Sequence, residues 1–345
     1  MKKILKSRIA LLIGTAMILT LGGCGSKPAP VPGEGGKTEP AKEAAQEEKQ
    51  DYPKEVIHIV VTFSAGGGND LIARAVASAM EEAIGATVIV DNITGAGGLT
   101  GTQEAASAKP DGYTILCQDS SLTSMLVTQK PDITMDDLIP VASVYSCPTW
   151  VLSHTDRGYH TLQDFVDAAK DNPGQLTIGT AVTTGSQYLM GCAIAEFFDL
   201  DVTIIPYTGG NELKAAILGN QIDIGIVHSP ILLPEVKDGM VQVLAAGDSL
   251  EDINEDSLKG VPTLAGYGME ETFSSTRGFF VPKDTPAEIV DYLGRLFRDC
   301  LETEAMKEFS ATFGFEPGYQ NQEEYRAFLQ DELEGYQAVF DSINR

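Results

Sequence analysis

The sequence predicts an α/β fold whose sheets are mostly parallel, and three observations support this prediction. Short runs of apolar, β-branched residues, typical of strands buried on both faces, alternate with segments that carry apolar residues at helical spacing. Loops rich in glycine or hydroxyl residues follow several of the strand-like runs. No apolar run after residue 52 is long enough to span a membrane. Regular alternation of strand and helix is typical of parallel sheets covered by helices.

The segment 56–80 predicts a strand, a glycine loop and a helix. Residues 56–63 form a nearly continuous β-branched run, residues 66–68 are glycines that permit a tight turn, and residues 71–80 have helical spacing. Asn69 or Asp70 is placed to cap this helix. Because the start of a helix offers free N–H groups and a positive dipole end, it favours an anion. We therefore expect an anion site made by Ser64, Ala65, Gly66, Gly67, Gly68, Asn69 and Asp70.

The next segment repeats this order. Residues 86–93 predict a second strand, residues 94–101 a second glycine loop and residues 102–108 a second helix. In a parallel sheet both loops emerge at the carboxyl edge of neighbouring strands, where open α/β sheets bind ligands. Each loop can also be an ordinary tight turn. Together they favour a pocket for a small, oxygen-rich anion, to which the second loop contributes Gly95, Ala96, Gly97 and Gly98.

Further strand and helix units follow. Residues 140–152 predict a long extended segment that crosses between two domains, and amphipathic helices are expected over 288–303 and 322–343. The other expected strands are 112–117, 176–179, 202–207, 222–227, 241–245 and 278–281, and the other helices are 161–170, 187–198 and 212–218. The loops 180–186 and 208–211 resemble the first two, which suits a two-lobed binding protein with its ligand between the lobes.

The first 24 residues predict a signal peptide over residues 1–23, followed by a cysteine that becomes lipidated. Residues 1–8 are basic, residues 9–21 are apolar but short for a membrane span, and two glycines precede Cys24. This order resembles the lipobox of bacterial lipoproteins, which implies cleavage after residue 23 and lipid attachment to Cys24. The alternative is an uncleaved anchor helix. Residues 24–50 have almost no large apolar residue, so we expect a disordered tether that reaches about 25–30 Å on average.

Charge and cysteine content exclude several classes of function. The net charge of −25 argues against nucleic acid and against an anionic membrane surface as partners. Cys117, Cys147, Cys192 and Cys300 lie far apart, in apolar surroundings and without neighbouring histidines. We therefore expect free thiols and no metal site, with three possible disulfide pairings as the alternative.

Two short motifs resemble enzyme signatures but lack the residues that should accompany them. Residues 95–100 nearly match a dinucleotide fingerprint, yet Thr100 stands where its third glycine should be. Residues 247–250 spell the Gly-Asp-Ser-Leu signature of an esterase family, yet no histidine follows His228. We therefore expect neither a cofactor nor catalysis.

Several motifs in consistent order resemble the tripartite tricarboxylate transporter receptor family, extracytoplasmic solute-binding proteins also called the Bug family. They lie at 52–70, 92–101, 109–116, 206–209 and 219–223, so the resemblance covers the chain from about residue 52 to its end. Thr62 stands where the family pattern has proline. The family often has a histidine a few residues after the glycine and serine that match Gly185 and Ser186, but residues 187–189 contain none, and His228 stands where many members carry an aspartate. The last two differences fall at the expected edge of the pocket.

The resemblance implies a two-lobed periplasmic-binding-protein fold of type 2, in which each lobe is a mostly parallel sheet flanked by helices. Lobe 1 is expected over residues 51–150 and 275–345, and lobe 2 over residues 151–274. Amides of the two glycine loops of lobe 1 would hold the ligand carboxylate. The distal part of the ligand would meet residues of lobe 2, namely Thr183, Thr184, Gly185, Ser186, Tyr207 and Thr208, with His228 either lining the pocket or packing in an ordinary loop.

The expected function is that of a receptor for a small organic acid. It would catalyse nothing and would deliver its ligand to the integral membrane subunits of a transporter. We expect a monomer held outside the cytoplasm by a lipid anchor on Cys24. The alternatives are a ligand-sensing module for a signalling partner and a secreted hydrolase. The sequence allows a dicarboxylate, a tricarboxylate, an aromatic acid or an amino acid as the ligand.

Overall fold

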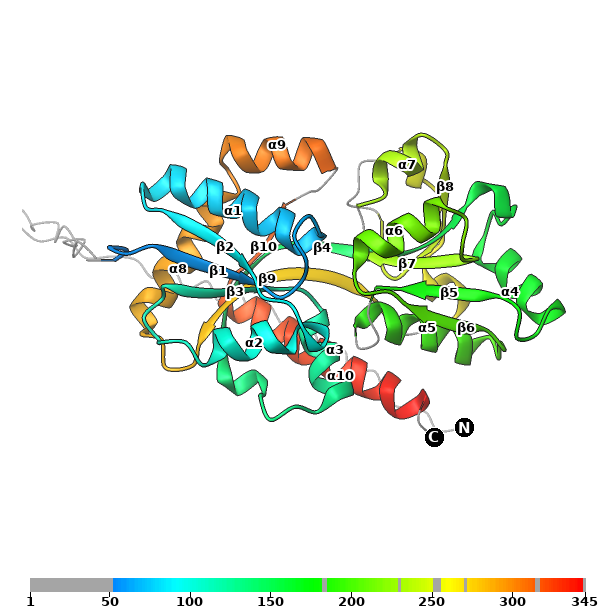
Figure 1. Cartoon of the computed structure of the whole chain (residues 1–345), viewed down its shortest axis with the longest axis horizontal. Helices are drawn as coiled ribbons and strands as arrows, with labels where there is room; N and C mark the ends of the chain where they lie inside the picture. Colours follow the sequence, from blue (N-terminus) through cyan, green and yellow to red (C-terminus); the bar gives the residue numbers. More distant parts are fainter. Residues whose placement is uncertain are drawn as a thin grey trace, which may run out of the picture. The chain divides into compact units, whose positions relative to one another are not determined.

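The predicted alternation of strands and helices is present in the computed structural model (Figure 1), which describes residues 52–181, 185–228, 231–250, 256–269, 272–313 and 317–343. These residues all belong to one compact unit, which extends over residues 51–345. The predicted signal peptide, the tether and Cys24 lie outside the described residues. Within the described part of the chain, no helix combines the length and the apolar character needed to cross a membrane.

In the described part of the chain, ten strands form two sheet regions that share one long strand. The strands are β1 (Ile57–Val61), β2 (Val88–Asn92), β3 (Thr114–Gln118), β4 (Leu138–His154), β5 (Thr177–Thr180), β6 (Thr203–Pro206), β7 (Ile224–His228), β8 (Val241–Ala246), β9 (Ser274–Pro282) and β10 (Pro317–Gln320). β1 pairs in parallel with β2 and β3, and β5 pairs in parallel with β6 and β7. The antiparallel pairs all involve β4 or β9, so the sheet is mixed where the chain passes between lobes.

The strand β4 confirms the predicted extended crossing segment. Its part up to Pro148 pairs with β9 in lobe 1, and its part from Thr149 to His154 pairs with β7 and β8 in lobe 2. The lobe boundaries predicted at 150/151 and 274/275 therefore fall within β4 and at the start of β9. The sheet partners of β4 change between Pro148 and Thr149, and the boundaries of the two lobes stay a prediction.

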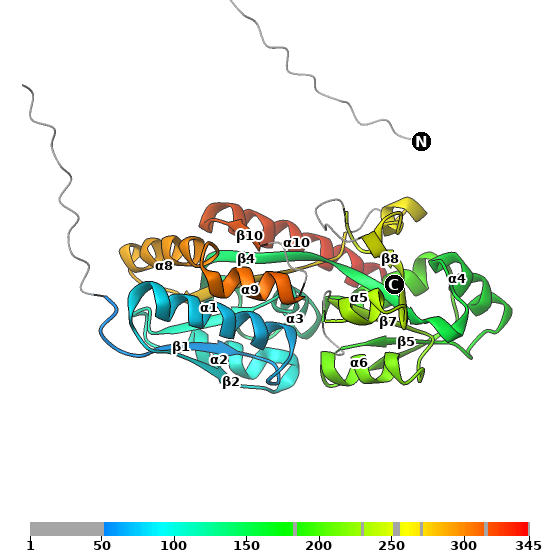
Figure 2. The ribbon, with the colours of Figure 1, turned by 90° about the horizontal axis from the view of Figure 1, so that it is seen from above.

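Helices cover both faces of the sheets (Figures 1 and 2). In lobe 1, α1 (Gly68–Ile84), α8 (Ala287–Cys300) and α9 (Glu304–Phe313) share one core with the sheet, and α2 (Leu99–Ala106) and α3 (Ser121–Gln129) pack on the other face. In lobe 2, α4 (Leu162–Asp171) and α5 (Ser186–Phe197) share a core that is separate from the core of α6 (Gly210–Leu218) and α7 (Leu233–Lys237). Each lobe thus has its own apolar interior.

The last helix, α10 (Gln322–Ile343), joins the two lobes (Figures 1 and 2). Tyr325 and Leu329, near its start, belong to a core of lobe 1 that includes residues of α2 and α3. Tyr336 and Val339, near its end, belong to the core of lobe 2 that includes residues of α4 and α5. One helix therefore packs into the cores of both lobes, beside the strands β4 and β9.

Local sequence explains how α4 begins, whereas α1 begins one turn earlier than its polar residues indicate. Thr161 and Asp164 form a capping box, because the Thr161 hydroxyl accepts from Asp164 N at 3.2 Å and the Asp164 carboxylate accepts from Thr161 N at 2.8 Å. The predicted cap of α1 by Asn69 or Asp70 is wrong. The N-cap residue is Gly67, and both polar residues lie in the first helical turn.

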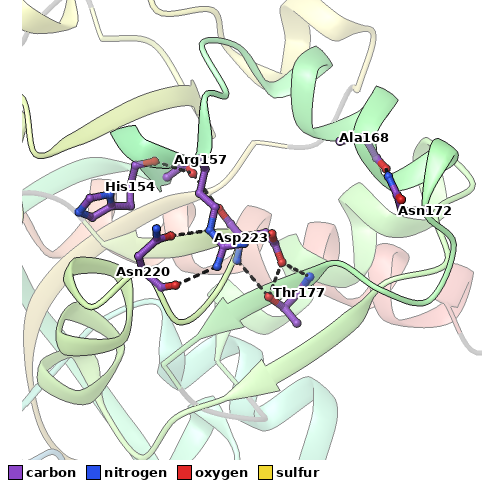
Figure 3. A network of polar contacts seen from close by, with 8 residues as sticks. His154, Arg157, Ala168, Asn172, Thr177, Asn220 and Asp223 are labelled. Atoms are coloured by element: carbon purple, nitrogen blue, oxygen red, sulfur yellow. Dashed lines mark hydrogen bonds and ion pairs between the residues drawn. The ribbon is translucent and has the colours of Figure 1, made fainter.

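A polar network holds the amino ends of β5 and β7 together (Figure 3). The Asp223 carboxylate accepts from Thr177 N at 2.9 Å, from the Thr177 hydroxyl at 2.8 Å and from Arg157 Nη1 at 2.5 Å. Arg157 Nη2 also donates to the carbonyl of Asn220 at 2.9 Å. Residues 219–223 thus stabilise the edge of lobe 2 at the amino ends of its strands, opposite the edge where the carboxyl ends lie. The same residues resemble a family motif.

Candidate functional site

The first glycine loop brings the start of α1 to the carboxyl end of β1. Gly66 adopts a φ of 78°, which favours glycine, and its N–H donates to Asp70 Oδ2 at 2.8 Å. Gly67 N donates to the carbonyl of Ser64 at 3.2 Å. The N–H groups of these two glycines are therefore used within the loop. The first amides of α1 itself, from Gly68 onward, have no side-chain cap among the described residues and are the ones available to an anion.

Asp70 fixes the shape of this loop. Its buried carboxylate accepts from Gly66 N, from Arg74 Nε at 3.0 Å and from Asn92 Nδ2 at 2.9 Å. Burial opposes ionisation of Asp70, but these hydrogen bonds and the charge of Arg74 outweigh it and hold the pKa below its ordinary value. Asn92 Nδ2 also donates to the carbonyl of Phe63 at 3.0 Å, so the end of β2 supports the same loop.

The second glycine loop packs against Thr62 and Gln118, at the ends of β1 and β3. Gly95, Gly97 and Gly98 all have positive φ angles, of 136°, 65° and 101°. A Cβ on Gly98 would lie 3.1 Å from Gln118 Nε2 and 3.2 Å from Thr62 Oγ1, so the loop fits closely over these polar side chains. The positive φ angles and the close fit explain the glycines of this loop by backbone geometry and packing.

Both lobes line one cavity of about 220 Å³. Its wall takes residues from the first glycine loop, from the ends of β3, β5 and β7, from the loop before α6, and from β9. The lining residues are Phe63, Ser64, Gly67, Gly68, Asn69, Asp119, Ser121, Ala181, Gln187, Thr208, Gly209, Gly210, Asn211, Glu212, Val227, His228, Ile231 and Arg277. The described part of the chain has no cluster of three or more His, Cys, Asp or Glu residues arranged to hold a metal ion.

The structure brings part of the predicted binding set to this cavity. Ser64, Gly67, Gly68, Asn69, Thr208 and His228 line it. Among the described residues, the other predicted ones stand outside its lining: Ala65, Gly66, Asp70, Gly95, Ala96, Gly97, Gly98, Gly185, Ser186 and Tyr207. Thr183 and Thr184 lie outside the described residues. A role in ligand binding stays a prediction for all of these residues, inside and outside the lining.

His228 is held in a neutral form at the end of β7. Its Nδ1 lies 3.1 Å from Thr149 Oγ1, and its Nε2 lies 3.2 Å from Ser186 Oγ. Burial lowers the pKa of His228 to about 4, the charge of Asp119 opposes this shift, and Arg277 adds to it. Both ring nitrogens therefore have hydroxyl partners, and the imidazole presents an uncharged surface to the cavity at neutral pH.

Sequence reasoning missed the two buried charges of the cavity, Arg277 and Asp119. Arg277 lies on β9, far along the chain from the glycine loops, between Thr276 and Gly278 in a strand whose other side chains are mostly buried. Asp119 follows the last residue of β3. An arginine directly before the apolar run of the predicted strand 278–281 was the available signal, because a charged side chain is rarely buried in a strand without a function or a partner.

Comparisons with known proteins agree with this architecture. A family model described as "Tripartite tricarboxylate transporter family receptor" matches residues 72–345. Protein BugT of Bordetella pertussis is 28% identical over 306 residues, which cover 86% of this chain and 91% of that protein. A protein of Cupriavidus necator, named for its place in the gbd 5′ region, is also 28% identical over 305 residues, covering 87% and 90% of the two chains.

Solved structures share the fold. The periplasmic binding protein BugD is 26% identical, with a TM-score of 0.76, and the match covers 85% of this chain and 99% of that one. A protein from Rhodopseudomonas palustris with bound malate is 22% identical, with a TM-score of 0.73, covering 84% and 99%. A second R. palustris protein, with adipate, is 21% identical, with a TM-score of 0.77, covering 85% and 99%.

Proposed function

The chain belongs to the tripartite tricarboxylate transporter receptor family, and on this basis we propose that it captures a small carboxylate outside the cytoplasm and delivers it to the membrane subunits of such a transporter. The observation that supports this proposal most is the cavity that residues of both lobes line. Its wall combines the start of α1 with polar side chains of lobe 2, which is the arrangement that a small anionic ligand needs.

The ligand carboxylate would lie at the start of α1, next to the backbone of Gly68 and Asn69. The helix dipole and free amides there stabilise a negative charge, and hydrogen bonds to an ionised acceptor are stronger than those between neutral groups. Thr208 and Asn211 of lobe 2 line the other side of the cavity and would meet the rest of the molecule. Malate and adipate occupy two neighbours of the same fold, so in those proteins it holds small dicarboxylates.

The two strands between the lobes would allow the cavity to close around its ligand. β4 passes from lobe 1 to lobe 2, and β9 lies beside it at the junction. A small rotation of the lobes about these strands would exclude water and strengthen each hydrogen bond to the ligand.

We further propose that the mature chain is tethered to the membrane through a lipid on Cys24, which would keep the receptor close to the transporter subunits.

The pair formed by Ser186 and His228 favours a serine hydrolase as a second candidate, because their side chains lie 3.2 Å apart. Other features of the pair oppose it. Ser186 is 1% exposed, Thr149 instead of a carboxylate meets the second ring nitrogen, and burial lowers the pKa of His228 to about 4, which makes the imidazole a weak base at neutral pH. We expect a fluorophosphonate probe to leave Ser186 unlabelled; labelling that Ser186→Ala abolishes would instead support the hydrolase.

A thermal-shift screen of the purified full chain tests the receptor function. The panel should hold dicarboxylates, tricarboxylates, aromatic acids and amino acids, with uncharged sugars as controls. An acid at a hundredfold excess over its dissociation constant should stabilise the folded protein by about 2.7 kcal/mol. Stabilisation confined to acids is the expected result. A response to sugars alone, or to no acid in the panel, would contradict the proposal.

A further inference from the structure

The cavity wall contains a buried guanidinium that lacks a full set of partners. Arg277 is 3% exposed. Its Nε donates to Asn69 Oδ1 at 2.8 Å, and its guanidinium lies over the ring of Tyr145 at 5.2 Å from the centroid. The guanidinium also forms a hydrogen bond with the Cys147 thiol, and its Nη1 is buried without a hydrogen-bond partner among the described residues. Its Nη2 lies against Gly68, since a Cβ on that glycine would be 2.8 Å away.

The same wall contains a buried carboxylate. Asp119 is 6% exposed and lines the cavity together with Arg277. Its Oδ1 accepts from Ser121 N at 3.0 Å, at the start of α3. Asp119 and Arg277 influence one another electrostatically, yet no ion pair within 4.0 Å joins these two described residues. The cavity therefore presents a positive and a negative group that are not paired with each other.

The remaining lining adds little further buried charge. His228 is uncharged at neutral pH, and Asn69, Gln187 and Asn211 are neutral amides. Glu212 lines the cavity from an exposed position, where its carboxylate accepts from Thr208 N at 3.2 Å. The two buried charges of the lining are thus those of Arg277 and Asp119, which makes them the groups that a ligand must complement.

We propose that the ligand carries an ammonium group as well as a carboxylate, so that Arg277 and Asp119 select an amino acid over the simple acid of the same skeleton. This inference rests on the proposed receptor function. The ligand carboxylate would lie at the start of α1 beside the Arg277 guanidinium, and the ammonium group would lie beside the Asp119 carboxylate. One zwitterion would then pair both buried charges.

Electrostatics favours this ligand over a simple diacid. A buried charge without a partner is costly, and a ligand that supplies the opposite charge removes that cost on binding. A diacid can pair with Arg277, but it brings a second negative charge into a cavity that already holds Asp119. At low effective dielectric, repulsion between like charges a few ångströms apart is large, so discrimination against the molecule without an ammonium group should be strong.

Calorimetric titration of the purified full chain with matched ligand pairs tests the inference. The pairs share one carbon skeleton and differ by the α-ammonium group: L-aspartate and succinate, L-glutamate and glutarate, L-alanine and propionate, L-phenylalanine and 3-phenylpropionate. In the pair that fits the cavity, the amino acid should bind at least about tenfold more tightly. Equal or tighter binding of the simple acid would overturn this inference and leave the receptor function standing. Binding of no acid at all would overturn both.

Variants of Asp119 assign the selectivity to this carboxylate. In Asp119→Asn the amide oxygen can still accept from Ser121 N, so the start of α3 keeps its hydrogen bond while the charge is removed. We expect this variant to lose the preference for the amino acid and to bind the simple acid as well as before or better. Asp171→Asn, an equal change of charge on exposed Asp171 of α4, should behave like the native chain.

The outcomes separate an electrostatic role from a structural one. If Asp119→Asn weakens both members of the pair equally, Asp119 only supports α3 and the assignment is wrong. If the preference survives in a folded Asp119→Asn protein, the assignment is also wrong. If the Asp119→Asn protein does not fold, Asp119→Ser takes its place in this test, because the serine hydroxyl can accept the same hydrogen bond from Ser121 N. Arg277→Gln should weaken both members by about tenfold or more, and Arg277→Lys should recover part of that loss.

Discussion

The Thr123 hydroxyl donates to a carboxylate oxygen of Glu332 at 2.5 Å, and this hydrogen bond fastens α10 to α3 of lobe 1. One turn further along α10, the Tyr336 hydroxyl bonds to Ser186 at the start of α5 in lobe 2. Two neighbouring side chains of one helix thus hold the two lobes. Glu332 also faces a second cavity, lined by residues of α10 and of the segment before β9.

Glu332 should make the stability of the protein depend on pH. Burial raises the pKa of Glu332 to about 7, although hydrogen bonds from Ser120, Thr123 and Tyr336 oppose the shift and the charge of Asp119 adds to it. Between the ordinary carboxyl pKa of about 4.5 and about 7, the folded state binds a proton that the unfolded state has released. The contribution of Glu332 to the free energy of unfolding should therefore fall as pH rises through this range, by on the order of 2 kcal/mol, since the residue is only half-buried. The buried neutral His228 contributes in the opposite direction between its folded pKa of about 4 and its ordinary value of 6.5.

Urea unfolding at about pH 5 and about pH 8 measures this effect. Glu332→Gln keeps an oxygen that accepts from Thr123 and removes the titration of Glu332, while His228 titrates in both proteins. Relative to this variant, the native chain should therefore lose on the order of 2 kcal/mol of unfolding free energy between the two pH values. Glu323→Gln, at an exposed position on the same helix, should keep the native pH dependence. An unchanged pH dependence in Glu332→Gln would show that Glu332 titrates like an ordinary carboxyl group.

Gly68 should be required for ligand affinity. A Cβ at this position would lie 2.8 Å from Arg277 Nη2, and Arg277 is held in place by Asn69 and Tyr145. Gly68→Ala should therefore displace the guanidinium and weaken binding of the acid found in the thermal-shift screen by about tenfold, or about 1.4 kcal/mol. Titration calorimetry measures the change.

Gly335→Ala is the matched control for that variant. Gly335 lies in α10 with no heavy atom within 4 Å of an added Cβ, so alanine should stabilise the helix by about 0.5–1 kcal/mol and leave ligand affinity unchanged. Native affinity in a folded Gly68→Ala protein would mean that the position of the guanidinium does not matter for binding.

Much of the fold could be predicted because local sequence and final packing agree. The run that forms β1, the glycines after it and the apolar spacing of α1 all indicate the same unit, and the structure has it. The helix α3 was missed. Its residues Ser121, Thr123, Ser124 and Thr128 have low helix propensity, and hydroxyls such as that of Thr128, which donates to the Ser124 carbonyl at 2.8 Å, bond to the helix backbone. Packing against α10 decides the conformation there.

The candidate site could be predicted only where it is local in sequence. The first glycine loop is one continuous motif, and most of its predicted residues line the cavity. Arg277 and Asp119 are more than 150 positions apart, and they meet the same cavity because β9 lies antiparallel beside β3. Only the register of that strand pair brings them together, and no local pattern encodes it.

Cys24→Ser should release the protein from the membrane fraction. The proposed lipid attaches to the thiol of Cys24, and a serine hydroxyl does not replace it, so the variant loses the lipid anchor that holds the protein at a bilayer. Fractionation of cells that express each form, followed by immunoblotting, measures the distribution. Cys192→Ser, a change at a half-buried free thiol of α5, should leave the protein with the membranes. Membrane retention of Cys24→Ser would contradict the anchor.

Asp223→Ala should destabilise lobe 2 without changing ligand affinity. The substitution removes the acceptor of three hydrogen bonds from Thr177 and Arg157, and it leaves the half-buried Arg157 guanidinium without its carboxylate (Figure 3). Removing one partner of such a charged network should lower the free energy of unfolding by about 2–3 kcal/mol. Urea unfolding measures this loss, with Asp171→Asn as the control that changes charge alone.

Because Asp223 precedes β7 whereas His228 ends it, the network and the cavity lie at opposite ends of the strand. A loss of affinity as large as the loss of stability would show that the two ends are coupled.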